Sequence, residues 1–300
     1  STVFRAKEGG WQFNLHSYLI HFDGKFCAMW TSGRVDEGAN GTIIRFETST
    51  DGHTWKQGPT ITRSPMKKDG KPGMAIARGL FIKDGKLNAL VAFMDKDIWS
   101  KNVYKKGWKN LRLMRFEWDG VKWNNCGVYL DDCMNNYPPR PIKDKLFMTR
   151  RDGKSRNVYT VLADSLKGEK WTSTPLPGEP PADRMTEPTW FIDPDGIVHI
   201  VFRDMRRQGF LYRSLSHDDG ATFSAPVKTN YPDTPGKNFT GRLSSGEYYL
   251  ISNPGPTRDP LAISFSNDGW TFAKPAALRN KAPEVRYKGN ANKSRTFHYP

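Results

Sequence analysis

The sequence has few of the features that mark several common protein classes. It contains only 3 cysteines in 300 residues, too few for a disulfide framework. No apolar run approaches the roughly 18 residues that a membrane-spanning helix needs, so we expect no membrane insertion. Stretches rich in alanine and leucine, which favour helices, are also scarce. These absences argue against an integral membrane protein and against a helical bundle.

Groupings typical of metal ligands are missing as well. Cys27 lies in an apolar segment and is expected in the core, whereas Cys126 and Cys133 are close enough in sequence to form one disulfide. None of the three has the spacing of a zinc site, and the 6 histidines include no HxxxH-like pair. We therefore expect neither a metal nor another cofactor.

Acidic residues are fewer than basic ones. There are 31 Asp and Glu against 46 Lys and Arg, a formal net charge of +15. This balance suggests an anionic partner such as nucleic acid or an acidic glycan. Nucleic-acid-binding proteins usually cluster their basic residues on one element or in a tail, but here they are spread along the chain. We favour an anionic oligo- or polysaccharide over nucleic acid, and a basic surface without a specific partner remains open.

Turn formers and aromatic residues are abundant, with 27 Gly, 21 Pro and 13% aromatics, which favours an all-β chain. One short motif recurs as STDGHTW at 49–55, SHDDGATF at 216–223 and SNDGWTF at 266–272. Two weaker copies end at Trp123 and Trp171. Ser and Asp side chains bond turn backbone, Gly supplies a positive φ, and the last aromatic packs between sheets. We interpret the motif as a structural device.

A second repeat falls in the same phase. Apolar alternation flanks five tight turns, at Asp23-Gly24, Asp84-Gly85, Lys143-Asp144, Asp195-Gly196 and Ser245-Gly246. Such patterns predict β-hairpins. Repeated four-stranded units about 50 residues long are typical of a β-propeller. Five units are complete and a sixth begins at 295–300, so we predict six four-stranded antiparallel blades in one domain over 1–300, with five blades as the alternative.

The repeated motif resembles the Asp box of the sialidase superfamily, whose members are six-bladed propellers. The resemblance implies a glycan-acting protein, secreted or periplasmic. It also implies that functional residues lie near the central axis, where the first strand of a blade starts and the second strand ends. The motif itself specifies the fold well and the chemistry poorly.

Blade four carries the best match to the family's site. Glu187 and Arg203 bracket a hairpin as do the family's glutamate, which activates a tyrosine nucleophile, and one arginine of its carboxylate-binding triad. Arg258 resembles the last arginine of that triad, and Tyr299 the nucleophile. His298 is the rival of Tyr299, because consecutive strand residues point to opposite faces.

Blade one departs from the family pattern. His16 stands where the first triad arginine is expected, and a histidine there suits general acid or base catalysis. Arg34 matches the family. The acid/base aspartate falls on Asn40, which cannot transfer a proton as Asp does, although Asp36 and Glu37 in the same loop are substitutes.

Further candidates near the axis follow from the repeat phase alone. They are Arg78, Asp95, Asn136, Tyr137, Arg150, Arg151 and Asn238. Many are arginines, so they would focus a positive field on an anionic ligand. An isolated acid such as Asp95 among them is either a salt-bridge partner or a proton carrier, and we favour the salt bridge.

The predicted function is cleavage of a glycosidic bond in a uronate-bearing, sulfated or sialylated glycan. Arg34, Arg203 and Arg258 would bind the substrate charge, and His16, Asp95 or the Glu187–Tyr299 pair would transfer protons. A polysaccharide lyase on the same scaffold and a non-catalytic carbohydrate-binding propeller are the alternatives.

Overall fold

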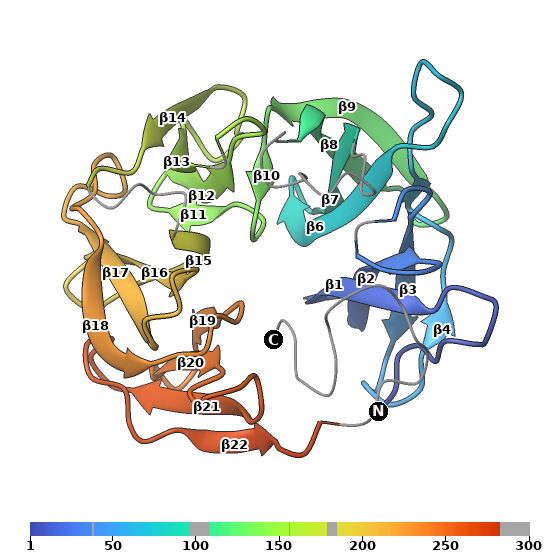
Figure 1. The fold of residues 1–300 in the computed structure, drawn as a ribbon. Coiled ribbons are helices and arrows are strands. Elements are labelled where there is room, and N and C mark those ends of the chain that lie inside the picture. The colour runs from blue at the N-terminus through green and yellow to red at the C-terminus, as the bar shows by residue number, and fades with distance from the viewer. Residues whose placement is uncertain (38, 96–107, 156, 179–184, 283–300) are drawn as a thin grey trace. The chain divides into compact units, whose positions relative to one another are not determined.

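The computed structural model describes residues 1–37, 39–95, 108–155, 157–178 and 185–282. These residues form five antiparallel sheets, which we number as blades in chain order (Figure 1). In every blade four strands pair in a path that follows the chain. Within the described residues no apolar helix of membrane-spanning length occurs.

The strands of each blade have the following bounds. Blade 1 holds β1 (Phe13–Phe22), β2 (Lys25–Gly33), β3 (Ile43–Ser49), β4 (Lys56–Gln57) and β5 (Thr62–Arg63). Blade 2 holds β6 (Met74–Lys83), β7 (Lys86–Asp95), β8 (Lys109–Trp118) and β9 (Trp123–Asp131). Blade 3 holds β10 (Met134–Asn135), β11 (Arg140–Ile142), β12 (Lys145–Arg151), β13 (Val158–Ala163) and β14 (Trp171–Pro175). Blade 4 holds β15 (Met185–Ile192), β16 (Val198–Asp204), β17 (Phe210–Ser216) and β18 (Val227–Pro232). Blade 5 holds β19 (Phe239–Arg242), β20 (Tyr248–Ser252), β21 (Leu261–Ser266) and β22 (Ala276–Arg279).

The number of blades corrects the sequence-based prediction. The described residues form five blades, so the five-bladed alternative holds and the prediction of six is wrong for this structure. Each of the five hairpin units counted in the sequence forms one sheet. The sixth blade rested only on residues 295–300, which lie outside the described residues.

The chain divides into two compact units. Among the described residues, the first unit comprises Ser1–Arg140 and 150–155, and the second comprises Pro141–Thr149 and 157–282. Blades 1 and 2 therefore belong to the first unit and blades 4 and 5 to the second, and the boundary passes through β12 of blade 3.

The predicted tight turns are present. Phe22 pairs with Lys25 across Asp23 and Gly24, whose φ angles are 49° and 69°. The turn between β6 and β7 repeats this geometry at Asp84 (φ 50°). Positive φ at both central residues matches the twist of the paired strands. The Asp-Gly signal therefore set the register of these two hairpins correctly.

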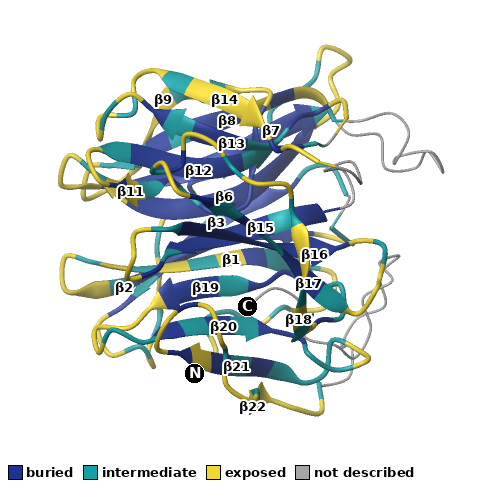
Figure 2. Ribbon diagram, turned by 90° about the vertical axis from the view of Figure 1, so that its left-hand side faces the viewer, coloured by how far each residue is buried: buried dark blue, intermediate teal, exposed yellow. Residues whose placement is uncertain are grey.

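Each unit has its own apolar core. In the first, residues of blades 1 and 2 pack together around Met29, Phe46, Leu80 and Phe93. In the second, one cluster surrounds Phe147 and another extends into blade 5. The inner strands β6 and β7 are buried along nearly their whole length, whereas β14 and β22 are mostly exposed (Figure 2). A strand covered on both faces needs an apolar run, which explains the weak alternation there.

The repeated motifs close surface turns, as predicted. In blade 5 the Asp268 carboxylate accepts hydrogen bonds from the Ser266 hydroxyl (2.8 Å) and the Trp270 N–H (2.7 Å). The same arrangement occurs at Asp51 and Asp218. Backbone hydrogen bonds from Thr54 and His53 lower the pKa of the Asp51 carboxyl. These carboxylates are occupied in holding turns, which confirms their structural role.

The cysteines differ in part from expectation. Cys27 is buried in the core as predicted. Cys126 is exposed and Cys133 is buried, and both are free thiols, so the disulfide considered from their spacing is not formed.

Candidate functional site

Candidates on first and second strands meet at the same end of each sheet. The two strands form an antiparallel hairpin, so the start of one lies beside the end of the other. In blade 4, Thr186 at the start of β15 pairs with Arg203 near the end of β16. In blade 1, Asn14 pairs with Ser32 just before Arg34. This topology explains why candidates chosen by repeat phase lie at one end of their own sheet.

Three candidates occupy equivalent β-bulges. The register of the first two strands slips once in blade 1 between Leu15 and Tyr18, once in blade 2 between Ala77 and Gly79, and once in blade 4 between Thr186 and Thr189. The residues inserted at these slips include His16, Arg78 and Glu187. A bulge turns a side chain out of the regular alternation and is frequent beside active sites.

The backbone at two of these bulges is unusual for the residue type. His16 has a φ of 58° and Glu187 a φ of 53°, in the left-handed region that few residues other than glycine adopt. In blade 2 the positive φ falls on Gly79, at 132°. Such conformations persist only where the surrounding structure enforces them.

In the second unit, Glu187 and Arg203 form an ion pair. The Arg203 guanidinium donates a hydrogen bond to the Glu187 carboxylate, and both side chains are largely buried, with 10% and 14% of their surface exposed. Guanidinium and carboxylate groups match as planar forks. The hairpin therefore brings the two predicted residues together as an ion pair, and Glu187 holds Arg203 in position.

Arg258 lies in the same unit, in the loop between β20 and β21. Its Nε donates a hydrogen bond to the Pro235 carbonyl at 3.0 Å. Pro235 belongs to the segment between β18 and β19, which also contains Asp233 and Lys237, both buried.

Asp233 was not among the sequence candidates. Burial raises the pKa of its carboxyl to about 8, and the positive charges of Arg203 and Arg258 offset only part of that effect. Its Oδ1 atom is enclosed and accepts no hydrogen bond from the described residues. A buried carboxyl with a raised pKa, subject to the charges of two candidate arginines, is an arrangement that functional sites often contain. Asp233 lies in the sequence Pro-Asp-Thr-Pro, which indicates only a turn, so the sequence does not predict that its carboxyl is buried.

In the first unit, His16 lies beside an acid. Its Nε2 is 3.4 Å from Oε1 of Glu37, and its side chain is 8% exposed against 32% for Glu37. Of the three loop residues considered as the acid, the structure thus brings Glu37 to His16. Asn40, to which the family resemblance assigns the acid/base position, has an enclosed side-chain oxygen that accepts no hydrogen bond within the described part of the chain.

Two candidate arginines stack on tryptophans that the sequence analysis did not single out. The Arg34 guanidinium lies 4.9 Å from the centroid of the Trp11 ring. The Arg151 guanidinium lies 5.0 Å from that of Trp108. Stacking on an aromatic face restrains an arginine and leaves its N–H groups directed outward.

Arg78 and Arg150 both lie close to the buried thiol of Cys133. Burial raises the pKa of that thiol to about 12, and the two arginines oppose the rise. Arg150 also donates a hydrogen bond to the Asp132 carbonyl at 2.6 Å. The carbonyl of Arg78 accepts a hydrogen bond from the Asn135 amide at 3.0 Å. These contacts fix both arginines in the first unit.

Two other candidates, Asp95 and Tyr137, have partners among the described residues. Asp95 accepts a hydrogen bond from the Asn110 amide at 2.6 Å and pairs with no arginine among the described residues, so the favoured salt bridge is wrong. Asp95 and Asn110 meet because β8 returns antiparallel beside the end of β7. Tyr137 is buried and packs edge-on against Tyr18, with ring centroids 6.3 Å apart.

Four further candidates remain. Asn238 is fully buried just before β19, and the Asn136 carbonyl accepts a hydrogen bond from the Tyr18 hydroxyl at 2.7 Å. Tyr299 and His298 lie outside the described residues.

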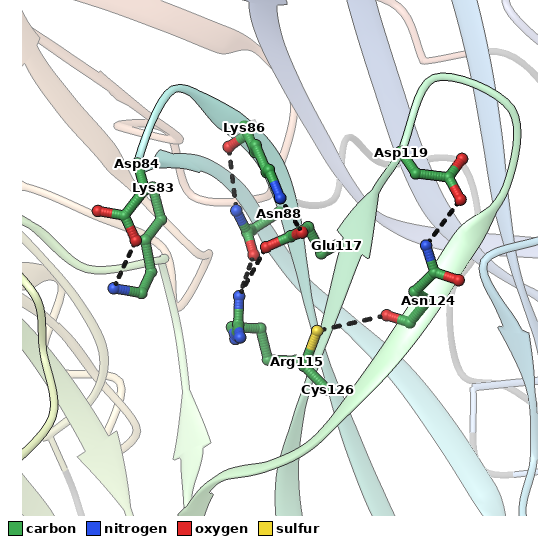
Figure 3. Close-up of polar contacts among 9 residues, drawn as sticks. All are labelled: Lys83, Asp84, Lys86, Asn88, Arg115, Glu117, Asp119, Asn124 and Cys126. Carbon is green, nitrogen blue, oxygen red and sulfur yellow. Dashed lines mark hydrogen bonds and ion pairs between the residues drawn. The ribbon is translucent and has the colours of Figure 1, made fainter.

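A second polar cluster lies at the opposite end of the blade 2 strands from Asp95. Lys86 contacts Glu117 at 2.7 Å, and Arg115 donates a hydrogen bond to Asn88 at the same distance (Figure 3). Cys126 is drawn close by, with its thiol directed to the Asn124 carbonyl (Figure 3). The Lys86 side chain is 59% exposed. Exposed ion pairs contribute little to stability, and we assign this cluster to the surface of β7, β8 and β9.

Nothing in the described residues groups three His, Cys, Asp or Glu side chains as metal ligands. The candidate chemistry therefore consists of arginines with positioned carboxylates and one histidine–glutamate pair.

Sheets of this form define a β-propeller of four-stranded antiparallel blades. The family model described as "BNR repeat-like domain" matches residues 24–300. The chain belongs to that family. No curated protein matches the sequence.

The chain is similar to several solved structures. A Hadza microbial sialidase has 16% identity and a TM-score of 0.69, covering 89% of this chain and 59% of its own. A protein of unknown function from Dyadobacter fermentans has 14% identity and a TM-score of 0.66, covering 90% and 84%. Trypanosoma rangeli sialidase, in complex with the inhibitor DANA, has 13% identity and a TM-score of 0.63, covering 88% and 49%. Identities this low show a shared fold, and the chain spans only about half to three fifths of the two sialidase chains.

Proposed function

We propose that this protein acts on an anionic glycan, with uronate, sulfate or sialic acid groups, and cleaves a glycosidic bond in it. The observation that carries the proposal is the buried pair of Glu187 and Arg203 at a β-bulge. An arginine oriented by a carboxylate presents a rigid fork to a carboxylate or sulfate of the ligand. Arg258 supplies a second positive charge in the same unit, and Arg34 and Arg151 extend the basic character of the first unit.

The proposed proton transfer rests on His16. Imidazole donates and accepts protons near neutral pH, and Glu37 at 3.4 Å would orient the ring and stabilise its charged form. Asp95 and Tyr299 are secondary proposals for a proton carrier and a nucleophile. A polymeric extracellular substrate would also accord with a secreted or periplasmic protein.

The test is a panel of uronate-bearing, sulfated and sialylated glycans. New reducing ends without unsaturated products are expected from the wild type. His16→Ala should abolish most of this signal. His21→Ala is the matched control, because His21 lies on the same strand but packs edge-on against Phe26 at the surface hairpin. Unsaturated products would instead identify a lyase, and binding without either signal would identify a carbohydrate-binding propeller.

A further inference from the structure

The segment at 233–236, which carries the Asp233 carboxyl, is held in place by three contacts of its backbone. Its own N–H donates to the Gly209 carbonyl at 2.9 Å, in the turn after β16. The Arg258 guanidinium binds the Pro235 carbonyl two residues further on. A Cβ atom on Gly236 would lie 2.4 Å from the Asn253 side-chain oxygen, so the segment packs tightly on its neighbour. Asp233 is only 5% exposed.

Two candidate ligand-binding residues act on this carboxyl electrostatically. Arg203 reaches it from β16 and Arg258 from the loop between β20 and β21. Asp233 itself takes part in no ion pair within the described residues, and its Oδ1 atom is enclosed. The other charged groups around it are Asp204, Arg206 paired with Asp204, Glu187 paired with Arg203, and the buried Lys237.

This arrangement favours the neutral acid. A carboxylate that is buried without an ion pair loses most of its hydration and gains too little in return. While Asp233 is neutral, it does not compensate the charges of the two arginines. Once it ionises, its negative charge acts on the same two guanidinium groups that an anionic ligand would use.

We propose that Asp233 determines the anion affinity of Arg203 and Arg258: its neutral carboxyl leaves their charge to the ligand, and its carboxylate competes with the ligand for that charge. Asp233 is thereby a residue that sets ligand specificity by charge. The inference rests on the proposed function, which assigns the two arginines to an anionic glycan. It implies that the ligand is released as the pH rises.

The ionisation itself is measured by NMR on protein labelled with carbon-13 at the aspartate carboxyls. The resonance missing from Asp233→Asn belongs to Asp233, and we expect it to titrate at about pH 8. Saturating sulfate should raise this midpoint by about one pH unit or more, because coupling between two sites is reciprocal and a nearby charge shifts a pKa by roughly 1–3 units. Titration in the ordinary aspartate range, or a midpoint that sulfate does not move, overturns the proposal.

The affinity is measured by calorimetry with sulfate at about pH 6 and about pH 9, where the ion itself keeps its charge. Wild-type affinity should fall about fivefold or more over this range, as expected when binding raises the pKa from about 8 by one unit. Asp233→Asn should bind equally at both pH values. Asp195→Asn, which removes an exposed carboxylate in the turn between β15 and β16, is the charge-matched control and should behave as wild type. An equal loss of affinity in wild type and Asp233→Asn overturns the proposal.

Failure of the proposed function gives a different result. If folded Arg203→Ala binds sulfate and the glycan panel as wild type does, the arginine is not a ligand contact, and both proposals are wrong. If glycan binding depends on Arg203 but not on pH, only the role of Asp233 is wrong. Should Asp233→Asn fail to fold, the pH dependence of wild-type sulfate affinity decides, and a constant affinity overturns the proposal.

Discussion

Arg203 combines a proposed ligand contact with a structural role, and its removal separates the two. Because both side chains of the pair are largely buried, Arg203→Ala leaves the Glu187 carboxylate enclosed without its partner. Breaking a buried pair in this way costs about 3–5 kcal/mol of stability. The double variant Glu187→Gln with Arg203→Met removes both charges and should recover most of the loss. Urea unfolding measures both values, and a single variant as stable as wild type would contradict the enclosure of Glu187.

The histidine–glutamate pair in the first unit gives a prediction on turnover. General acid or base assistance is worth about 10²–10⁴ in rate, so His16→Ala should reduce turnover on the best glycan by roughly that factor. Glu37→Gln keeps a hydrogen-bonding group beside the ring but removes the charge 3.4 Å away. We expect a smaller fall in kcat with little change in KM. If His16→Ala instead raises KM and leaves kcat unchanged, His16 is a binding residue.

At the scale of elements, hairpins were predictable and bulges were not. Asp-Gly turns are recognisable from the local sequence, and the pairing of Phe22 with Lys25 follows from the two residues between them. The slips that insert His16 and Glu187 depend on how neighbouring strands pack, which no local pattern encodes. The repeat phase placed these residues in the correct strands. The sequence alone did not show that Glu37, and not Asn40, lies beside His16, because this depends on how the loop folds.

The bulge of β6 gives a prediction on an element. Gly79 has a φ of 132°, and a Cβ there would lie 2.5 Å from Cδ of Pro138. Gly79→Ala must therefore strain the backbone and displace Pro138. Gly85→Ala is the matched control, because its φ of 72° is also positive but nothing lies within 4 Å. We expect about 1–2 kcal/mol for Gly85→Ala from conformation alone and a clearly larger loss for Gly79→Ala, both measured by chemical unfolding. Equal losses of stability in the two variants would show that Pro138 can move aside at little cost.

For the molecule as a whole, the count of complete repeats predicted the number of sheets, but the burial of Asp233 could not be predicted from the sequence. Five turn motifs and five hairpins predicted the sheets that form, while the sixth blade was inferred from a six-residue fragment at 295–300. The environment of Asp233 is assembled from β16, from its own segment and from the loop that carries Arg258. Those segments are distant in sequence, so only the folded chain reveals that the carboxyl is enclosed.

That buried acid links the stability of the whole molecule to pH. The pKa of Asp233 is raised from 3.8 to about 8 in the folded chain, chiefly by burial. Between about pH 4 and pH 8 the folded chain therefore holds a proton that the unfolded chain has released. Its contribution to stability is complete below about pH 4, falls by up to about 1.4 kcal/mol per pH unit as the pH rises, and is constant above about pH 8.

Asp233→Asn cannot ionise and should remove this dependence. We expect the variant to gain stability relative to wild type steadily from about pH 5 to about pH 8, with a constant difference beyond that. Urea unfolding across this range measures the difference, in which every other titrating group cancels because both proteins contain it. A difference that is constant with pH would mean that Asp233 is ionised in the folded chain, as it would be if the arginines outweighed its burial.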